Sequence, residues 1–111
     1  MIDVNDPGEV YERRGQWQIL DVREPYEWEA GHIEEAEYIP LGEVMAGGER
    51  GRLDPERRVV VVCKTGNRSE LAALMLQARG FDAHNLEGGT EAWVTAGLPI
   101  VDSKGGPGRV V

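Results

Sequence analysis

Four consecutive valines at positions 59–62 constrain the fold more than any other feature of the sequence. A strand with one side in water alternates apolar and polar residues, whereas an unbroken β-branched run is typical of a strand covered on both faces. Strands of that kind belong to parallel sheets whose connecting helices pack on either side. The run therefore predicts the central strand of an α/β domain.

The rest of the chain alternates predicted strands with predicted helices. Proline just inside the start and glycine past the end delimit two short helices, at 7–14 and 25–30. The same reasoning gives strands at 1–4, 18–22, 36–39, 58–62 and 83–86, and further helices at 41–46, 69–79 and 90–96. In the helix from Ser69 the apolar residues at helical spacing are Leu71, Leu74, Met75 and Ala78. We expect a small five-stranded, mainly parallel sheet with helices on both faces.

Domain organisation follows from length and from loss of periodicity. The 111 residues suit one domain, which we place at 1–101. The Ser-Lys-Gly-Gly-Pro-Gly run after Asp102 has no apolar period, so 102–111 is predicted to be a flexible tail.

Charge and composition limit the partners and the compartment. With 20 acidic residues against 12 basic ones, the formal net charge of −8 disfavours nucleic acid and anionic membrane as partners. No apolar run approaches the ~20 residues that span a bilayer. A single cysteine cannot form an internal disulfide, and no cleavable leader is visible, so we expect a cytoplasmic protein. His32, Cys63 and His84 show no metal-ligand spacing, and no cofactor is implied.

The only cysteine, Cys63, follows the valine run directly, at a predicted junction of strand, loop and helix. The first amides of a helix lack partners within the helix, and a tight loop can direct its own amides to the same point, so such a junction binds anions. A thiolate is an anion, and Lys64 and Arg68 lie beside it in the sequence. These groups are expected to hold the thiol pKa below the free value of about 8.5. Cys63 is therefore a candidate nucleophile.

The alternative for Cys63 is a core position, because an unpaired cysteine is among the most often buried residues. The two cations and Gly66 in the loop that follows favour the nucleophile, since an ordinary core position needs neither.

Ligands of open α/β sheets bind outside the carboxyl ends of the strands. Cys63, the segment 21–23 and the segment 86–89 all stand at such ends, so we expect them to line one crevice. Asp21 and Arg23 are predicted to form an ion pair there. The Gly-Gly pair at 88–89 allows either a close approach of the backbone to a ligand or a plain turn.

Four segments, in this order, resemble the single-domain rhodanese family. They are Asp-Val-Arg-Glu-Pro-Tyr-Glu-Trp-Glu-Ala-Gly-His-Ile at 21–33, Ile-Pro-Leu at 39–41, Cys-Lys-Thr-Gly-Asn-Arg-Ser at 63–69, and Glu-Gly-Gly-Thr-Glu-Ala-Trp at 87–93 followed by Gly-Leu-Pro at 97–99. The resemblance covers about residues 2 to 100. Glu34 and Glu35 depart from it, because the family usually has Pro-Gly there.

The resemblance implies sulfur transfer through Cys63. The thiolate would take the outer sulfur of thiosulfate, a small anionic donor, and pass it from a persulfide to cyanide or to an external thiol, including a protein thiol. The loop would bind the donor through Lys64, Thr65, Gly66, Asn67, Arg68 and Ser69. His32 is expected to be structural, since a thiolate of low pKa needs no general base, and Trp28 and Trp93 are expected to pack.

Three other functions remain as alternatives. Tyrosine and dual-specificity phosphatases also place Cys and Arg around an anion loop, but with one residue more between them than the four found here. A binding module without turnover would keep the fold, although inactive relatives usually lose the cysteine. A persulfide carrier in a protein relay would use the same residues, and with no second cysteine any acceptor must be external.

Overall fold

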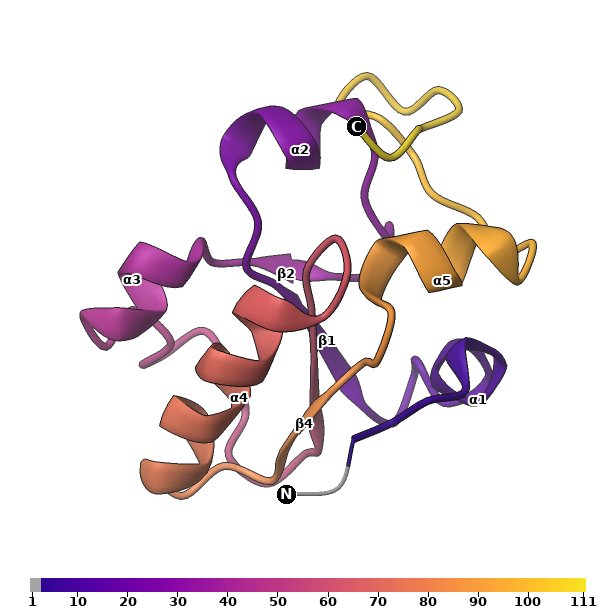
Figure 1. Cartoon of the computed structure of the whole chain (residues 1–111). Helices are drawn as coiled ribbons and strands as arrows, with labels where there is room; N and C mark the ends of the chain where they lie inside the picture. Colours follow the sequence, from indigo (N-terminus) through magenta and orange to yellow (C-terminus); the bar gives the residue numbers. More distant parts are fainter. Residues whose placement is uncertain (1–2) are drawn as a thin grey trace.

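A computed structural model describes residues 3–111 of the chain. It forms one parallel sheet with helices on both faces, which confirms the α/β prediction (Figure 1). The strands are β1 (Gln18–Asp21), β2 (Glu37–Tyr38), β3 (Val59–Val62) and β4 (Ala83–Asn85), in the order β2-β1-β3-β4. The helices are α1 (Pro7–Glu12), α2 (Pro25–Ala30), α3 (Leu41–Met45), α4 (Asn67–Ala78) and α5 (Gly89–Thr95).

Among residues 3–111 the sheet has four strands, whereas the sequence predicts five. Of the first predicted strand, Met1 and Ile2 lie outside the described residues. Val4 pairs with Leu86 through a single bridge, and the chain then enters α1 at Asp6 and Pro7. The Asp6 side chain caps α1 by accepting from the Gly8 amide, so the chain leaves the sheet edge two residues after Val4.

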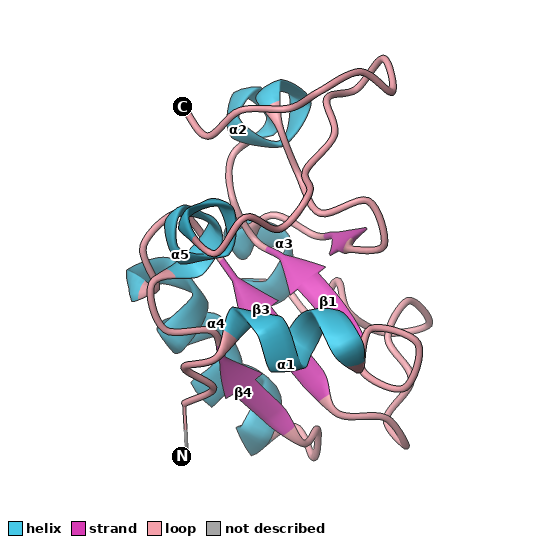
Figure 2. Cartoon of the chain, turned by 90° about the vertical axis from the view of Figure 1, so that its right-hand side faces the viewer, coloured by secondary structure: helices cyan, strands magenta, loops and turns pink. Residues whose placement is uncertain are grey.

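The valine run is buried on both sides, as predicted, and its alternation divides the core in two. All four valines are fully buried. Val59 and Val61 pack with residues of α3 and α4, whereas Val60 and Val62 pack with residues of α1 and α5, including Trp93. In Figure 2 β1 and β3 run between α1 in front and α4 behind.

Helix α4 differs from its prediction in start and in orientation. It begins at Asn67, two residues before Ser69. The helix buries the small Ala72 and Ala73 together with Leu76 against the sheet, while Leu71 and Leu74 are 46% and 47% exposed. Small side chains let the helix axis approach the β-branched strand closely, and this packing places the N-terminus of α4 directly behind Cys63.

The segment 102–111 lies beside α2, which stands at the top of Figure 1. Arg109 donates its amide to Ala30, and Ser103 donates to Glu29. Gly31 touches the Arg109 backbone so closely that a Cβ there would come within 2.4 Å of it. The mobility predicted for 102–111, and a domain boundary at 101, stay predictions. Within residues 3–111 no helix is long and apolar enough to cross a membrane.

Candidate active site

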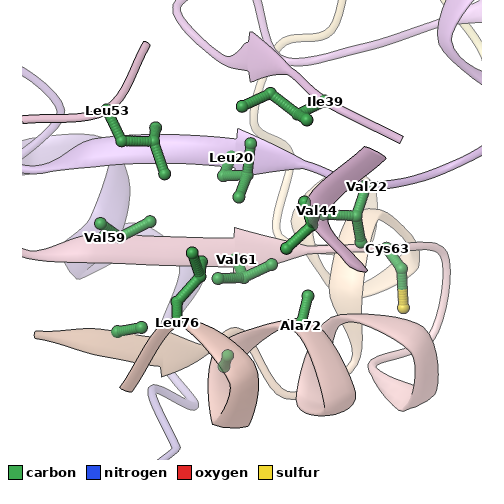
Figure 3. Packing of buried hydrophobic residues seen from close by; sticks show 12 residues of the cluster. Leu20, Val22, Ile39, Val44, Leu53, Val59, Val61, Cys63, Ala72 and Leu76 are labelled. Atoms are coloured by element: carbon green, nitrogen blue, oxygen red, sulfur yellow. The ribbon is translucent and has the colours of Figure 1, made fainter. Parts of the chain in front are cut away.

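Cys63 ends β3 and begins the loop that leads into α4. Figure 3 shows it at one end of the apolar cluster, with its sulfur directed away from the valine and leucine side chains. The residue is 1% exposed, so its Cβ belongs to the core while its sulfur meets the loop. The burial fits the core alternative, and the position fits the junction of strand, loop and helix that the sequence predicts.

The loop encloses the sulfur with hydrogen-bond donors. Gly66 donates its amide to Sγ at 3.1 Å, and the Ser69 hydroxyl lies 3.3 Å from the same atom. Burial raises the pKa of this thiol, but the hydrogen bonds from Ser69 and from the loop amides lower it by more. The net pKa of Cys63 is therefore below its ordinary value, which favours the thiolate that a nucleophile requires.

Gly66 makes the turn possible. Its φ of +112° lies in the left-handed region that side chains rarely adopt, and it is the residue immediately before α4. The turn directs the Gly66 amide back to the sulfur, three residues earlier in the chain.

The N-terminus of α5 fixes the loop from the other side. Thr90 donates its amide to the Cys63 carbonyl at 2.8 Å, and Glu91 donates to Lys64 at 3.1 Å. A Cβ on Gly89 would stand 2.2 Å from the Cys63 oxygen. The Gly-Gly pair thus brings the start of α5 against the backbone of the Cys63 loop, and its close approach to a ligand stays a prediction.

The two loop cations occupy different environments. The Arg68 guanidinium binds both carboxylate oxygens of Glu27 in α2, at 2.7 and 2.9 Å. These hydrogen bonds raise the Arg68 pKa, as does the charge of Cys63. Lys64 is half-buried and forms no ion pair with any residue between 3 and 111. Lys64 is therefore the cation of the two whose charge is available to an incoming anion, because Arg68 is already paired with Glu27.

Glu27 is a residue of the site that sequence reasoning did not select. Its side chain is 3% exposed, and its pKa is lowered, mainly by the hydrogen bonds from Arg68. The available signal was its place in the third position of a helix that begins with Pro25, where a glutamate also bonds back to the amide before the helix.

Asp21 and Arg23 form the predicted ion pair at the end of β1. Both side chains are fully buried, and the guanidinium meets the carboxylate at 2.7 Å while also donating to the Gly31 carbonyl. Arg23 thereby ties the strand end to the far end of α2.

The remaining candidates lie as follows. Thr65 and Asn67 have exposed side chains and line a hollow beside the loop. The His32 ring stacks on Trp28 with centroids 3.6 Å apart and bonds the Trp28 carbonyl through Nδ1, which fits a structural role. Trp93 is fully buried, and its indole donates to Pro99, so its packing role is confirmed.

Asn85 is the second site residue that the sequence did not reveal. It is 2% exposed at the end of β4, and its Oδ1 receives a very short hydrogen bond from Ser69. A polar residue on the same strand face as buried Ala83 was the available signal.

Comparisons with known proteins identify the family of the chain. Residues 6–96 match the rhodanese-like domain model. The chain is 32% identical to the thiosulfate sulfurtransferase GlpE of Vibrio cholerae over 100 residues, covering 89% of this chain and 92% of that protein. A crystal structure of a rhodanese-related protein from Thermoplasma volcanium superposes with a TM-score of 0.82 at 32% identity, covering 91% of this chain and 98% of the other.

Two further relatives are longer or matched over a shorter stretch. The probable adenylyltransferase/sulfurtransferase MoeZ of Mycobacterium tuberculosis is 41% identical over 76 residues, which is 68% of this chain and 19% of that protein. The putative sulfur carrier protein YrkF of Bacillus subtilis is 41% identical over 63 residues, 57% of this chain and 33% of the relative. The match over nearly the whole chain, together with the geometry around Cys63, shows that this protein belongs to the rhodanese-like domain family.

Proposed function

We propose that this protein is a sulfurtransferase that carries sulfane sulfur on Cys63, with thiosulfate or a related small anion as donor. The observation that supports this most directly is the pair of donors on Sγ, the Gly66 amide and the Ser69 hydroxyl, inside a loop that lowers the thiol pKa. A relative named thiosulfate sulfurtransferase adds support.

The proposed reaction has two steps. The Cys63 thiolate attacks the outer sulfur of thiosulfate, the sulfur–sulfur bond of the donor breaks, and sulfite leaves with the bonding pair. Cyanide or a thiolate then attacks the outer sulfur of the persulfide and regenerates the Cys63 thiolate. The loop amides stabilise the negative sulfur in both anionic states, as an oxyanion hole does for oxygen. Lys64 would attract the dianionic donor.

The proposal is tested by the intact mass of the purified protein before and after incubation with thiosulfate, followed by peptide mapping. We expect a gain of one sulfur atom on Cys63, which cyanide removes as thiocyanate. Cys63→Ser is the matched control and should gain nothing. If native protein gains no sulfur from thiosulfate, thiosulfate is not the donor, and a protein persulfide should be offered in the same assay.

A persulfide carrier in a protein relay is the second candidate. Cys63 is the only cysteine of the chain, so a persulfide can be discharged only to another molecule, and one relative is named a putative sulfur carrier. Rapid transfer to a protein thiol with negligible turnover of cyanide would favour the carrier. Hydrolysis of an aryl phosphate would instead revive the phosphatase alternative, and a protein that takes sulfur from no donor would be a binding module.

A further inference from the structure

Asn85 belongs to a buried hydrogen-bonded chain that reaches the reactive sulfur. The Ser69 hydroxyl lies 3.3 Å from Sγ of Cys63 and also contacts Oδ1 of Asn85. All three residues are 2% exposed or less. They come from β4, α4 and the end of β3, so the packing of three elements sets the chain.

A count of protons shows that these contacts cannot be made in a single hydrogen-bonding state. The Ser69 hydroxyl carries one proton, whereas a thiolate and a carbonyl oxygen both require one. If Ser69 donates to Oδ1, its lone pairs face the sulfur. If it donates to a thiolate, its lone pairs face Oδ1 across a very short contact, which is repulsive.

The amide of Asn85 can resolve this conflict by turning. A half-turn about its last side-chain bond exchanges Oδ1 and Nδ2 with little change in shape. Nδ2 then donates to the Ser69 oxygen, and Ser69 donates its proton to Sγ. On the other side of the amide lies Gly66, where a Cβ would stand 3.6 Å from Nδ2. Gly66 itself donates to Sγ.

We propose that Asn85 is a positioning residue of the sulfur site, whose amide directs the single Ser69 proton to Sγ when Cys63 is ionised and accepts that proton when Cys63 is a thiol. On ionisation the Cys63 thiol proton leaves to solvent. The hydroxyl proton stays bonded to the Ser69 oxygen, and the amide protons stay on the Asn85 nitrogen. The inference deepens the proposed function and rests on it only for the catalytic value of the thiolate.

Several charged groups surround this chain, and one of them, Arg68, interacts electrostatically with Cys63. They are Lys64 and Arg68 from the loop and α4, Glu27 from α2 behind Arg68, and Asp3, Glu70 and Glu87, which line a hollow together with Asn85. All of them are unchanged in the variants proposed below, so differences between those variants report on Asn85 and Ser69.

The test is the pH profile of alkylation of Cys63 by iodoacetamide, which yields the pKa of the thiol without any sulfur donor. Asn85→Asp keeps the shape but replaces the amide with a carboxylate that only accepts. It should hold the Ser69 proton permanently and raise the Cys63 pKa by about one unit or more, roughly tenfold less thiolate at a pH below both pKa values. An unchanged profile would overturn the proposal.

A double-mutant cycle separates the proton from the added charge. In the Ser69→Ala background Asn85→Asp can act only through its charge, so we expect a clearly smaller rise in the Cys63 pKa than in the native background. Equal rises in the two backgrounds would show that the charge alone acts, and would overturn the proposal.

Asn85→Ala adds no charge, and it keeps the test decisive if Asn85→Asp does not fold. It removes the amide that holds the Ser69 hydroxyl toward Sγ, so the Cys63 pKa should rise by part of the increase that Ser69→Ala causes. An unchanged Cys63 pKa would mean that the amide merely packs, and would overturn the proposal. Because these measurements need no donor, they can succeed even if no persulfide forms, and they can fail while sulfur transfer is intact.

Discussion

The carboxyl ends of the neighbouring strands β1 and β3 differ in how charge is placed and neutralised. At the end of β1 the charges are on side chains and are neutralised inside the protein, since the Asp21 and Arg23 side chains are fully buried and paired at 2.7 Å. At the end of β3 the polar groups are mainly backbone amides of a tight loop, and the Gly66 amide faces the sulfur. The first arrangement leaves little to offer a ligand. The second directs hydrogen-bond donors to one atom, the sulfur of Cys63, and these donors lower the pKa of its thiol.

The contact between Arg68 and Glu27 joins the two strand ends across 41 residues of sequence. The Arg68 guanidinium, beside the sulfur loop, is therefore held by a carboxylate of α2, the helix that follows β1. The comparison teaches that a cation near a reactive cysteine in the sequence need not be available to a substrate. The following predictions test this division: the end of β1 stabilises the fold, and the end of β3 carries the sulfur chemistry.

The largest effect is expected from Cys63→Ser. A serine hydroxyl stays protonated at neutral pH in the same loop, so sulfur transfer should fall at least about a thousandfold, to background. The residue is nearly isosteric and the loop contacts persist, so the thermal midpoint measured by circular dichroism should change little. Transfer above about one per cent of native would show that another group carries the sulfur.

Arg23→Met should cause the largest loss of stability at the β1 end. It leaves the buried Asp21 carboxylate without its partner, which costs about 3–5 kcal/mol. Urea unfolding at neutral pH measures this loss. Arg13→Met is the matched control, because its ion pair with Glu9 is 3.5 Å long and about half exposed. That control should cost about 0–1 kcal/mol. Similar costs for both variants would contradict the structural role given to the β1 end.

Glu27→Gln should reduce stability at neutral pH by about 1–2 kcal/mol, since the amide bonds Arg68 less strongly than the carboxylate does. The folded pKa of Glu27 is lowered. Its contribution is therefore fully present above the unfolded pKa of about 4.3 and is lost as the pH falls through the folded pKa.

The difference between native protein and Glu27→Gln should thus shrink in acid, as urea unfolding at neutral and acidic pH would show. Glu29→Gln, an exposed position on the same helix, is the control and should show no such pH dependence. A constant difference at every pH would mean that the Glu27 charge is not what stabilises the contact.

The sequence predicts those parts of the fold and the site that depend on neighbours along the chain. The valine run identified the central strand because burial on both faces leaves a local signature. The loop around Cys63 was predicted for the same reason, because the cysteine, Gly66 and the start of a helix follow within a few residues. The orientation of α4 was less accessible. Leu71 and Leu74 have helical spacing, but the approach of the helix to β3 selects the small Ala72 and Ala73.

Glu27 and Asn85 could not be placed by the sequence alone, for a physical reason. Each meets the sulfur loop only because parallel strands bring their carboxyl ends to one edge, and the contacts span 41 and 16 residues. A glutamate in the first turn of a helix and an asparagine in a strand each have ordinary local roles. Their position beside the sulfur loop arises only from which element packs beside which.

The smallest effect, and the sharpest test of the comparison, is expected from the two loop cations. Lys64→Ala should raise the KM for thiosulfate about fivefold with little change in kcat, because a half-buried cation with no ion pair among residues 3–111 contributes about 1 kcal/mol to capturing an anion. The effect should decrease at high salt, which screens such attraction. Lys104→Ala is the matched control, since the only other lysine is exposed in the segment 102–111.

Arg68→Ala should act mainly on stability, by leaving Glu27 unpaired. If Arg68→Ala instead raises KM more than Lys64→Ala does, the arginine leaves Glu27 to bind the donor, and the division between the two strand ends does not hold during turnover. If neither variant changes KM, the loop amides alone bind the donor.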